Sequence, residues 1–159
     1  MGPWIAAAAL LCLASSAWAD DGVYNGVMPS QVEAMLRQAG YPVTADLGKD
    51  PPVIWSRQGT EPFGIFLYSC THNADPLCQE IQFYAGFPVR GVFPTVLINE
   101  WNRTRRFGRA YIDADHNAAL EMDLDADGTS DVQLRDALQW WQTLVPQFQD
   151  FLDQTMKTS

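Results

Sequence analysis

The feature that most constrains this fold is a run of alternating side chains between Ala118 and Asp125. In this run the apolar and acidic residues take turns: Leu120, Met122 and Leu124 alternate with Glu121, Asp123 and Asp125. Successive side chains of a strand point to opposite faces, so a period of two predicts a strand with one face in the core and one acidic face. A second extended segment, Arg105 to Asp113, precedes it across a turn at 114–117. Together they predict an antiparallel hairpin.

Four arginines lie before and within the first strand of that hairpin: Arg103, Arg105, Arg106 and Arg109. Hairpin geometry would bring Arg106 and Arg109 alongside Glu121, Asp123 and Asp125, so we interpret them as architectural ion-pair partners of the returning strand. The alternative is that they form an interaction site, since arginine binds phosphate or carboxylate groups in a two-pronged geometry.

The rest of the chain supplies two further helical patterns before the last helix and a series of strands. We expect a helix from Ser30, with Ser30 and Glu33 as its capping box, and a stop at Gly40. The expected strands are Tyr41–Leu47, Val53–Arg57, Phe63–Cys70 and Cys78–Phe87, followed by a helix at Thr95–Thr104. The pattern α-β-β-β-β-α-β-β-α predicts an α+β fold, in which helices pack on an antiparallel sheet.

The last helix begins at Ser130, which forms a second capping box with Gln133. Pro146 lies within it and should bend it. Its apolar stripe has adjacent tryptophans, Trp140 and Trp141, and neighbours on a helix cannot both face the core. One of the two therefore points outward, which makes this helix a candidate contact surface.

The N-terminus has the pattern of an export signal. An apolar run from Trp4 to Leu13 precedes the small-x-small sequence Ala17-Trp18-Ala19. The run is shorter than the roughly 20 apolar residues that span a bilayer, so we expect a signal peptide, residues 1–19, cleaved after Ala19. A retained membrane anchor is the alternative. The mature protein would be periplasmic or secreted, with a mobile lead at 20–29 and a single domain at 30–155.

Cysteine usage agrees with export. Cys12 would leave with the signal, and Cys70 and Cys78 then flank a loop between two predicted strands. Facing cysteines at the mouth of a hairpin predict a disulfide in an oxidising compartment. The alternative is a metal pair joined by His72 and Asp75, although zinc sites usually place cysteines closer together and need four ligands.

Charge and motifs narrow the function classes. The formal net charge of −9 disfavours nucleic acid and anionic membranes as partners after signal cleavage. The chain has only two histidines, His72 and His116, both in predicted turns. It lacks Gly-x-Ser-x-Gly, His-Glu-x-x-His and a glycine-rich phosphate loop, so we expect no catalytic residues, no cofactor and no enzymatic activity.

An acidic loop follows the alternating strand and has part of a calcium-loop pattern. Asp123, Asp125, Asp127 and Asp131 occupy the first, third, fifth and ninth positions of such a loop. The twelfth position, where a bidentate carboxylate should lie, is Leu134. These aspartates are therefore only a weak metal candidate, and a strand and turn explain them without an ion.

Three short motifs carry a family resemblance: Asn99-Glu-Trp-Asn102, Arg106-Phe-Gly-Arg-Ala-Tyr111 and Leu120-Glu-Met-Asp123. With them, the stretch from about Ser30 to Leu152 resembles the YbjN domain family of bacterial sensory transduction regulators. The resemblance implies a fold similar to type III secretion chaperones and implies no known reaction. Asp127-Gly128 departs from the Gly-Gly common in the family, and many members lack an export signal.

These observations favour an exported, non-enzymatic module with a chaperone-like or regulatory role. Its expected partner is another protein or a second copy of the chain, bound through the sheet or the last helix. The alternative is a periplasmic sensor of a small ligand or calcium that uses the acidic loop 123–131. A hydrolase is the least favoured class.

Overall fold

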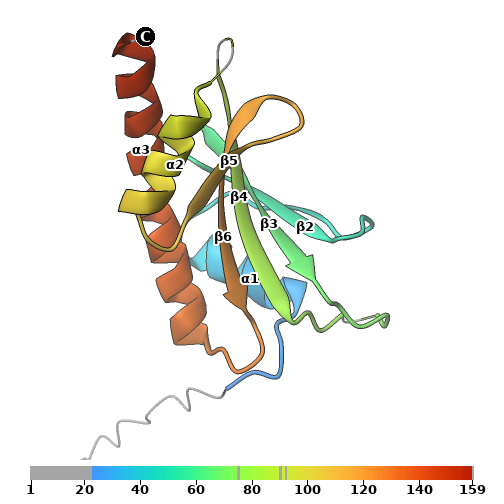
Figure 1. Ribbon diagram of the computed structural model, residues 1–159. Coiled ribbons are helices and arrows are strands. Elements are labelled where there is room, and N and C mark those ends of the chain that lie inside the picture. The colour runs from blue at the N-terminus through green and yellow to red at the C-terminus, as the bar shows by residue number, and fades with distance from the viewer. Residues whose placement is uncertain (1–22, 75, 90, 92, 159) are drawn as a thin grey trace, which may run out of the picture.

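The computed structural model describes residues 23–74, 76–89, 91 and 93–158; for residues 157 and 158 it describes the backbone alone. Its helices are α1 (Pro29–Gln38), α2 (Thr95–Thr104) and α3 (Asp131–Thr158). Its strands are β1 (Thr44–Asp46), β2 (Val53–Gln58), β3 (Glu61–Tyr68), β4 (Glu80–Pro88), β5 (Arg109–Ile112) and β6 (Asn117–Asp125). The strands form one antiparallel sheet in the order β1-β2-β3-β4-β6-β5 (Figure 1). The predicted α+β class and order of elements are confirmed.

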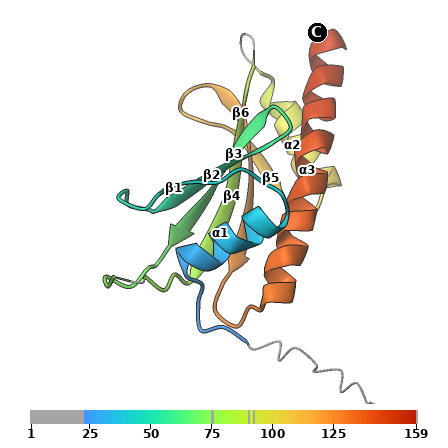
Figure 2. The same ribbon diagram turned by 180° about the vertical axis from the view of Figure 1, so that it is seen from behind.

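The helices pack on one face of the sheet, and the hydrophobic core lies between them (Figures 1 and 2). Alternation decides which side chains enter it: in β4, Ile81, Phe83, Ala85 and Phe87 are buried while the residues between them are not fully buried. Trp141 of α3 lies over the sheet, with its ring centroid 5.5 Å from that of Phe83. We call this the covered face.

The side chains that alternate with the buried ones along each strand point to the other side of the sheet, where no described helix packs (Figure 1). Cα pairing places these residues on one surface across the central strands. We call it the open face, and its members are Val53, Trp55, Arg57, Phe66, Tyr68, Glu80, Gln82, Tyr84, Arg109, Tyr111, Glu121, Asp123 and Asp125.

The predicted start of the first helix is wrong by two residues. Met28 is the N-cap of α1, Pro29 is its first residue, and the Met28 N–H donates to Oε1 of Gln31 at 2.8 Å. Gln31 therefore takes the part assigned to Glu33, which instead pairs with Arg37 at 2.9 Å on the helix surface. Proline suits the first helical position because its missing N–H would have no partner there.

The strand predicted from Arg105 begins only at Arg109. The helix before it is closed by the Arg105 N–H, which donates to the Trp101 carbonyl at 2.9 Å. Phe107 then adopts a left-handed backbone with φ 68°, which interrupts extended structure. Arg106 consequently lies in the connection before β5, and the prediction that it faces the acidic strand is wrong.

At the start of α3, Gln133 N–H donates to Ser130 Oγ at 3.4 Å, which confirms the predicted cap. The helix continues without a break through Pro146.

At the N-terminus, the predicted signal peptide lies outside the described residues. Residues Tyr24 to Val27 of the predicted lead are bonded to the domain: Tyr24 N–H donates to the Thr129 carbonyl at 2.7 Å. Among the described residues, no helix has the length and apolar character needed to cross a membrane.

Candidate functional site

The motif-bearing residues form one structural unit at the β5 edge of the sheet. The side-chain amide of Asn102 binds both backbone groups of Ala110: its Oδ1 accepts the N–H at 2.8 Å and its Nδ2 donates to the carbonyl at 3.0 Å. Asn102 thus takes the place of a neighbouring strand at this point. A Cβ on Gly108 would come within 3.1 Å of Leu120 and 3.2 Å of Leu144, so the approach to β5 is tightly packed.

A buried carboxylate is the centre of the β5–β6 pair on the open face. Glu121 is 5% exposed and lies directly opposite Arg109 in the register. Arg109 Nη2 is 2.6 Å from Glu121 Oε2, and the Tyr111 hydroxyl donates to Oε1. Burial, and then this hydrogen bond, raises the pKa of Tyr111. The charge of Glu121 likewise raises the pKa of Arg109.

Further hydrogen bonds extend from this pair across the open face. Gln82 Nε2 donates to Asp123 at 2.9 Å and Oε1 of Gln82 accepts from the Tyr68 hydroxyl at 3.1 Å. The Tyr84 hydroxyl donates to Asp113 at 2.9 Å. Burial and that hydrogen bond raise the pKa of Tyr84 to about 12. Burial works to raise the pKa of Asp113, but hydrogen bonds from Asn117 and Tyr84 outweigh it and lower the pKa.

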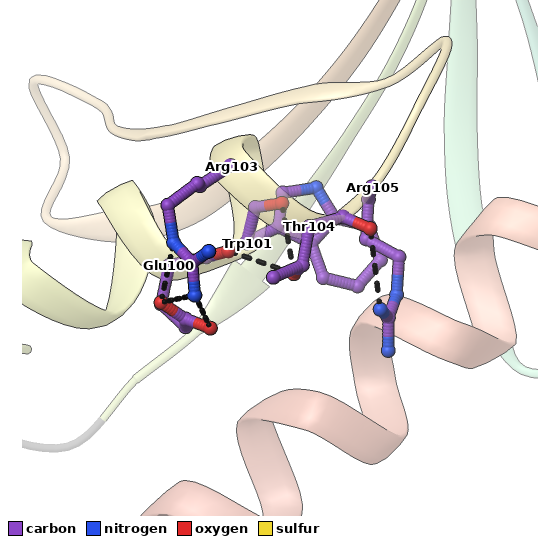
Figure 3. Close-up of polar contacts among 5 residues, drawn as sticks. All are labelled: Glu100, Trp101, Arg103, Thr104 and Arg105. Atoms are coloured by element: carbon purple, nitrogen blue, oxygen red, sulfur yellow. Dashed lines mark hydrogen bonds and ion pairs between the residues drawn. The ribbon is translucent and has the colours of Figure 1, made fainter.

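The arginines at the end of α2 have separate partners (Figure 3). Arg103 Nη2 donates to both Glu100 oxygens, at 2.7 and 2.9 Å. The Arg105 guanidinium lies 5.5 Å from the Trp101 ring centroid, a cation–π distance. Arg106 makes no hydrogen bond or ion pair with any residue that the structure describes. Of the four predicted arginines, Arg106 is thus the one without a hydrogen bond, ion pair or cation–π contact among the described residues.

Beside Arg106 lies a pair of exposed aromatic rings. Phe107 is 60% exposed and Trp140 is 48% exposed, and their ring centroids are 4.5 Å apart. Trp141, by contrast, is fully buried, so α3 presents one tryptophan outward and one inward as its sequence predicts. We call Arg106, Phe107 and Trp140 the ledge. Sequence reasoning missed Phe107, although an aromatic residue directly before a glycine in a connection was a usable signal.

Comparison with known protein families agrees with the motifs that form this unit. The family model YbjN, described as "Putative bacterial sensory transduction regulator", matches residues 29–154. The chain belongs to the YbjN family. No match was found among curated proteins or among solved structures. The matched range extends from the first residue of α1 almost to the end of α3, so it contains both the open face and the ledge.

The acidic loop of this YbjN protein does not gather its aspartates. Asp123 lies on β6 and accepts a hydrogen bond from Gln82 of β4, Asp125 accepts the Asp127 N–H at 3.0 Å, and Asp131 begins α3. Asp131 instead interacts with Tyr24 and raises the pKa of that phenol. In the part of the chain that is described, no group of three or more His, Cys, Asp or Glu side chains could hold a metal ion.

The two cysteines are joined in a disulfide, Cys70–Cys78. Cys78 is buried and its backbone pairs with Val27 in both directions, at 2.8 and 2.9 Å. The structure thus has the predicted bond and not the alternative metal pair, of which Asp75 lies outside the described residues. The disulfide closes the β3–β4 loop, and the backbone pairing of Cys78 with Val27 holds the end of that loop beside the segment that leads into α1.

Proposed function

We propose that this YbjN-family protein is an exported, non-enzymatic regulatory module that binds a partner protein through the ledge. The solvent-exposed pair of Phe107 and Trp140, whose rings lie in contact at a tilt of 31°, is the observation that carries the proposal. Tryptophan and arginine are the residue types most enriched among the residues that dominate protein–protein binding energies.

The ledge is held by rigid surroundings, which reduces the entropy lost when a partner binds. Trp140 projects from α3 next to the fully buried Trp141, so the helix cannot easily rotate. Phe107 precedes Gly108, where Leu120 and Leu144 leave no room for a larger residue: an added Cβ would come within 3.1 and 3.2 Å of them. A left-handed backbone at a non-glycine residue persists only where neighbouring contacts impose it, and such positions are common at functional sites.

Export is supported by the signal pattern at residues 1–19 and by the disulfide, which persists in oxidising compartments. The test is cell fractionation followed by mass spectrometry of the purified mature protein. We expect an N-terminus at Asp20 in a periplasmic or secreted fraction. A chain that retains Met1 in the membrane fraction would support the anchor alternative instead.

Partner binding is tested by affinity capture from the exporting cells, followed by measurement of the captured protein's affinity. Trp140→Ala and Phe107→Ala should each weaken binding by about 2 kcal/mol or more, as expected for a dominant contact. Leu47→Ala is the control, because it removes another exposed apolar side chain that belongs to neither the ledge nor the open face. Equal binding by wild type and Trp140→Ala would rule out the ledge as the contact surface.

A further inference from the structure

A continuous row of aromatic rings crosses the open face. Trp55 of β2 lies 5.8 Å from Phe66 of β3, and Phe66 lies 6.0 Å from Tyr84 of β4, both in edge-to-face geometry. Trp55 is 37% exposed, and Phe66 and Tyr84 are half-buried. A sheet surface that faces only water needs no such row, since alternation would allow short polar residues at each position.

Two glycines let these rings lie along the sheet. A Cβ on Gly64 would come within 3.0 Å of the Trp55 ring, and a Cβ on Gly86 would come within 2.9 Å of the Tyr84 hydroxyl. The rings therefore occupy space that a larger residue would fill. Their faces and edges are arranged before any partner arrives, which lowers the cost of binding.

Carboxylates lie on the β4–β6 side of the row. Glu80, Asp123 and Asp125 lie beside it on β4 and β6, and Asp113 bonds to Tyr84. The cations on this face are Arg57 and Arg109, and Arg109 pairs with both Glu121 and Asp123. The negative potential also acts on Tyr68: burial, and then the charges of Glu121, Asp123 and Glu80, raises the pKa of its phenol. The face thus combines aromatic rings with an excess of negative charge.

We propose that the open face binds an extended segment of a partner protein that presents Arg or Lys side chains. Cations bind over aromatic rings, and Arg does so most often. The flanking carboxylates supply the complementary charge. A second copy of the chain fits poorly, because two such faces would bring like charges together.

Recognition would occur across the face and not by addition of a strand at the β5 edge. Asn102 already occupies the backbone N–H and carbonyl of Ala110 on that edge. The open face also lies on the side of the sheet opposite to α3, the helix that carries Trp140. The proposal is therefore independent of the ledge, and each can fail without the other.

The probe is a short synthetic peptide of alternating Arg and Ser, compared with Glu–Ser and Gln–Ser peptides of the same length. Binding is followed by backbone amide shifts of the full mature protein and by fluorescence anisotropy at low salt. We expect only the Arg peptide to bind, with shifts concentrated on β2, β3, β4 and β6 and with affinity that falls as salt rises. Equal binding of the Gln peptide, or shifts confined to other surfaces, would overturn the proposal.

Matched variants separate a specific face from general attraction to an acidic protein. Trp55→Leu keeps an apolar residue but removes the ring, and it should lower the affinity for the Arg peptide about 3- to 10-fold. The double variant Glu80→Gln with Asp125→Asn should also lower the affinity for the Arg peptide. The double variant Asp150→Asn with Asp153→Asn makes the same change in net charge at exposed positions of α3 and should leave this affinity unchanged.

Two outcomes would contradict the assignment directly. Equal loss of affinity in both charge-neutralised pairs would show unspecific attraction. Self-association that Trp55→Leu abolishes, seen by sedimentation, would assign the face to a second copy of the chain. Trp140→Ala should bind the Arg peptide as wild type does, so this test and the capture experiment report on separate surfaces.

Discussion

The two faces of this sheet are ordered by different forces. On the covered face, large rings pack in contact: Trp101 and Phe148 have centroids 4.8 Å apart, and Trp141 lies on Phe83. On the open face, a hydrogen-bonded network around the buried Glu121 fixes the side chains. Apolar burial is the dominant favourable term in folding, whereas a hydrogen-bonded network gives less net stability and more positional order. The difference suggests that the covered face maintains the fold and that the open face is free to serve binding.

The largest effect should come from the covered face. Trp141→Ala should lower the free energy of unfolding by about 3–5 kcal/mol, because it removes a fully buried ring and leaves a cavity. Urea unfolding followed by circular dichroism measures the change. Trp140→Ala, one residue earlier on α3, is the control and should cost much less because its ring is 48% exposed. Similar losses for both variants would mean that α3 does not divide its tryptophans between core and surface.

The next effect should come from Arg109→Gln, with a loss of about 1–3 kcal/mol. An exposed ion pair would contribute only ~0.2–1 kcal/mol, the size that the sequence alone suggests. The structure predicts a larger loss of unfolding free energy, because Glu121 is 5% exposed and would be left buried without its cation. The double variant Arg109→Gln with Glu121→Gln should recover much of the loss in a denaturation cycle. If the double variant is no more stable than Arg109→Gln, the two groups do not act as a pair.

The sequence could predict elements that depend on local patterns. The alternation in β6, the hairpin with β5, the Ser130 cap and the disulfide all follow from residues close together in the chain. It could not predict that Arg106 lies off the strand, because this depends on the left-handed backbone at Phe107, a residue type that rarely adopts it.

Contacts between residues far apart in the sequence could not be predicted either. Phe107 and Trp140 meet only because α3 packs beside the connection that precedes β5. The bond from Asn102 to Ala110 replaces a strand at the edge, and no local pattern signals such a contact. The aromatic row on the open face likewise needs the register of β2, β3 and β4, although its members have the composition of ordinary strands.

A pH-dependent effect should distinguish the open face from the covered face. The phenol pKa of Tyr84 is raised from 10.0 to about 12, so between these values the folded state keeps a proton that the unfolded state releases. Stability should therefore fall as pH rises through this window. Tyr84→Phe should make the fall shallower, while the raised pKa of Tyr111 leaves a residual slope. An unchanged slope in melting temperature between pH 9.5 and 12 would show that Tyr84 does not contribute to it.

The smallest effect on stability should come from Arg106→Gln, which is compared with Arg109→Gln in the same motif. Arg106 and Arg109 are three positions apart, yet within the described part of the chain only Arg109 has a carboxylate partner. Arg106→Gln should change the free energy of unfolding by no more than about 0.5 kcal/mol, the usual range for surface substitutions. It should nevertheless weaken a partner bound at the ledge, because this guanidinium lies next to Phe107 in the chain and has no competing bond among the described residues. Arg37→Gln, on the surface of α1, is the control for loss of one positive charge, although it also gives up the pair with Glu33. Loss of stability in Arg106→Gln comparable to that in Arg109→Gln would place both arginines in the architecture and leave the aromatic pair alone as the contact.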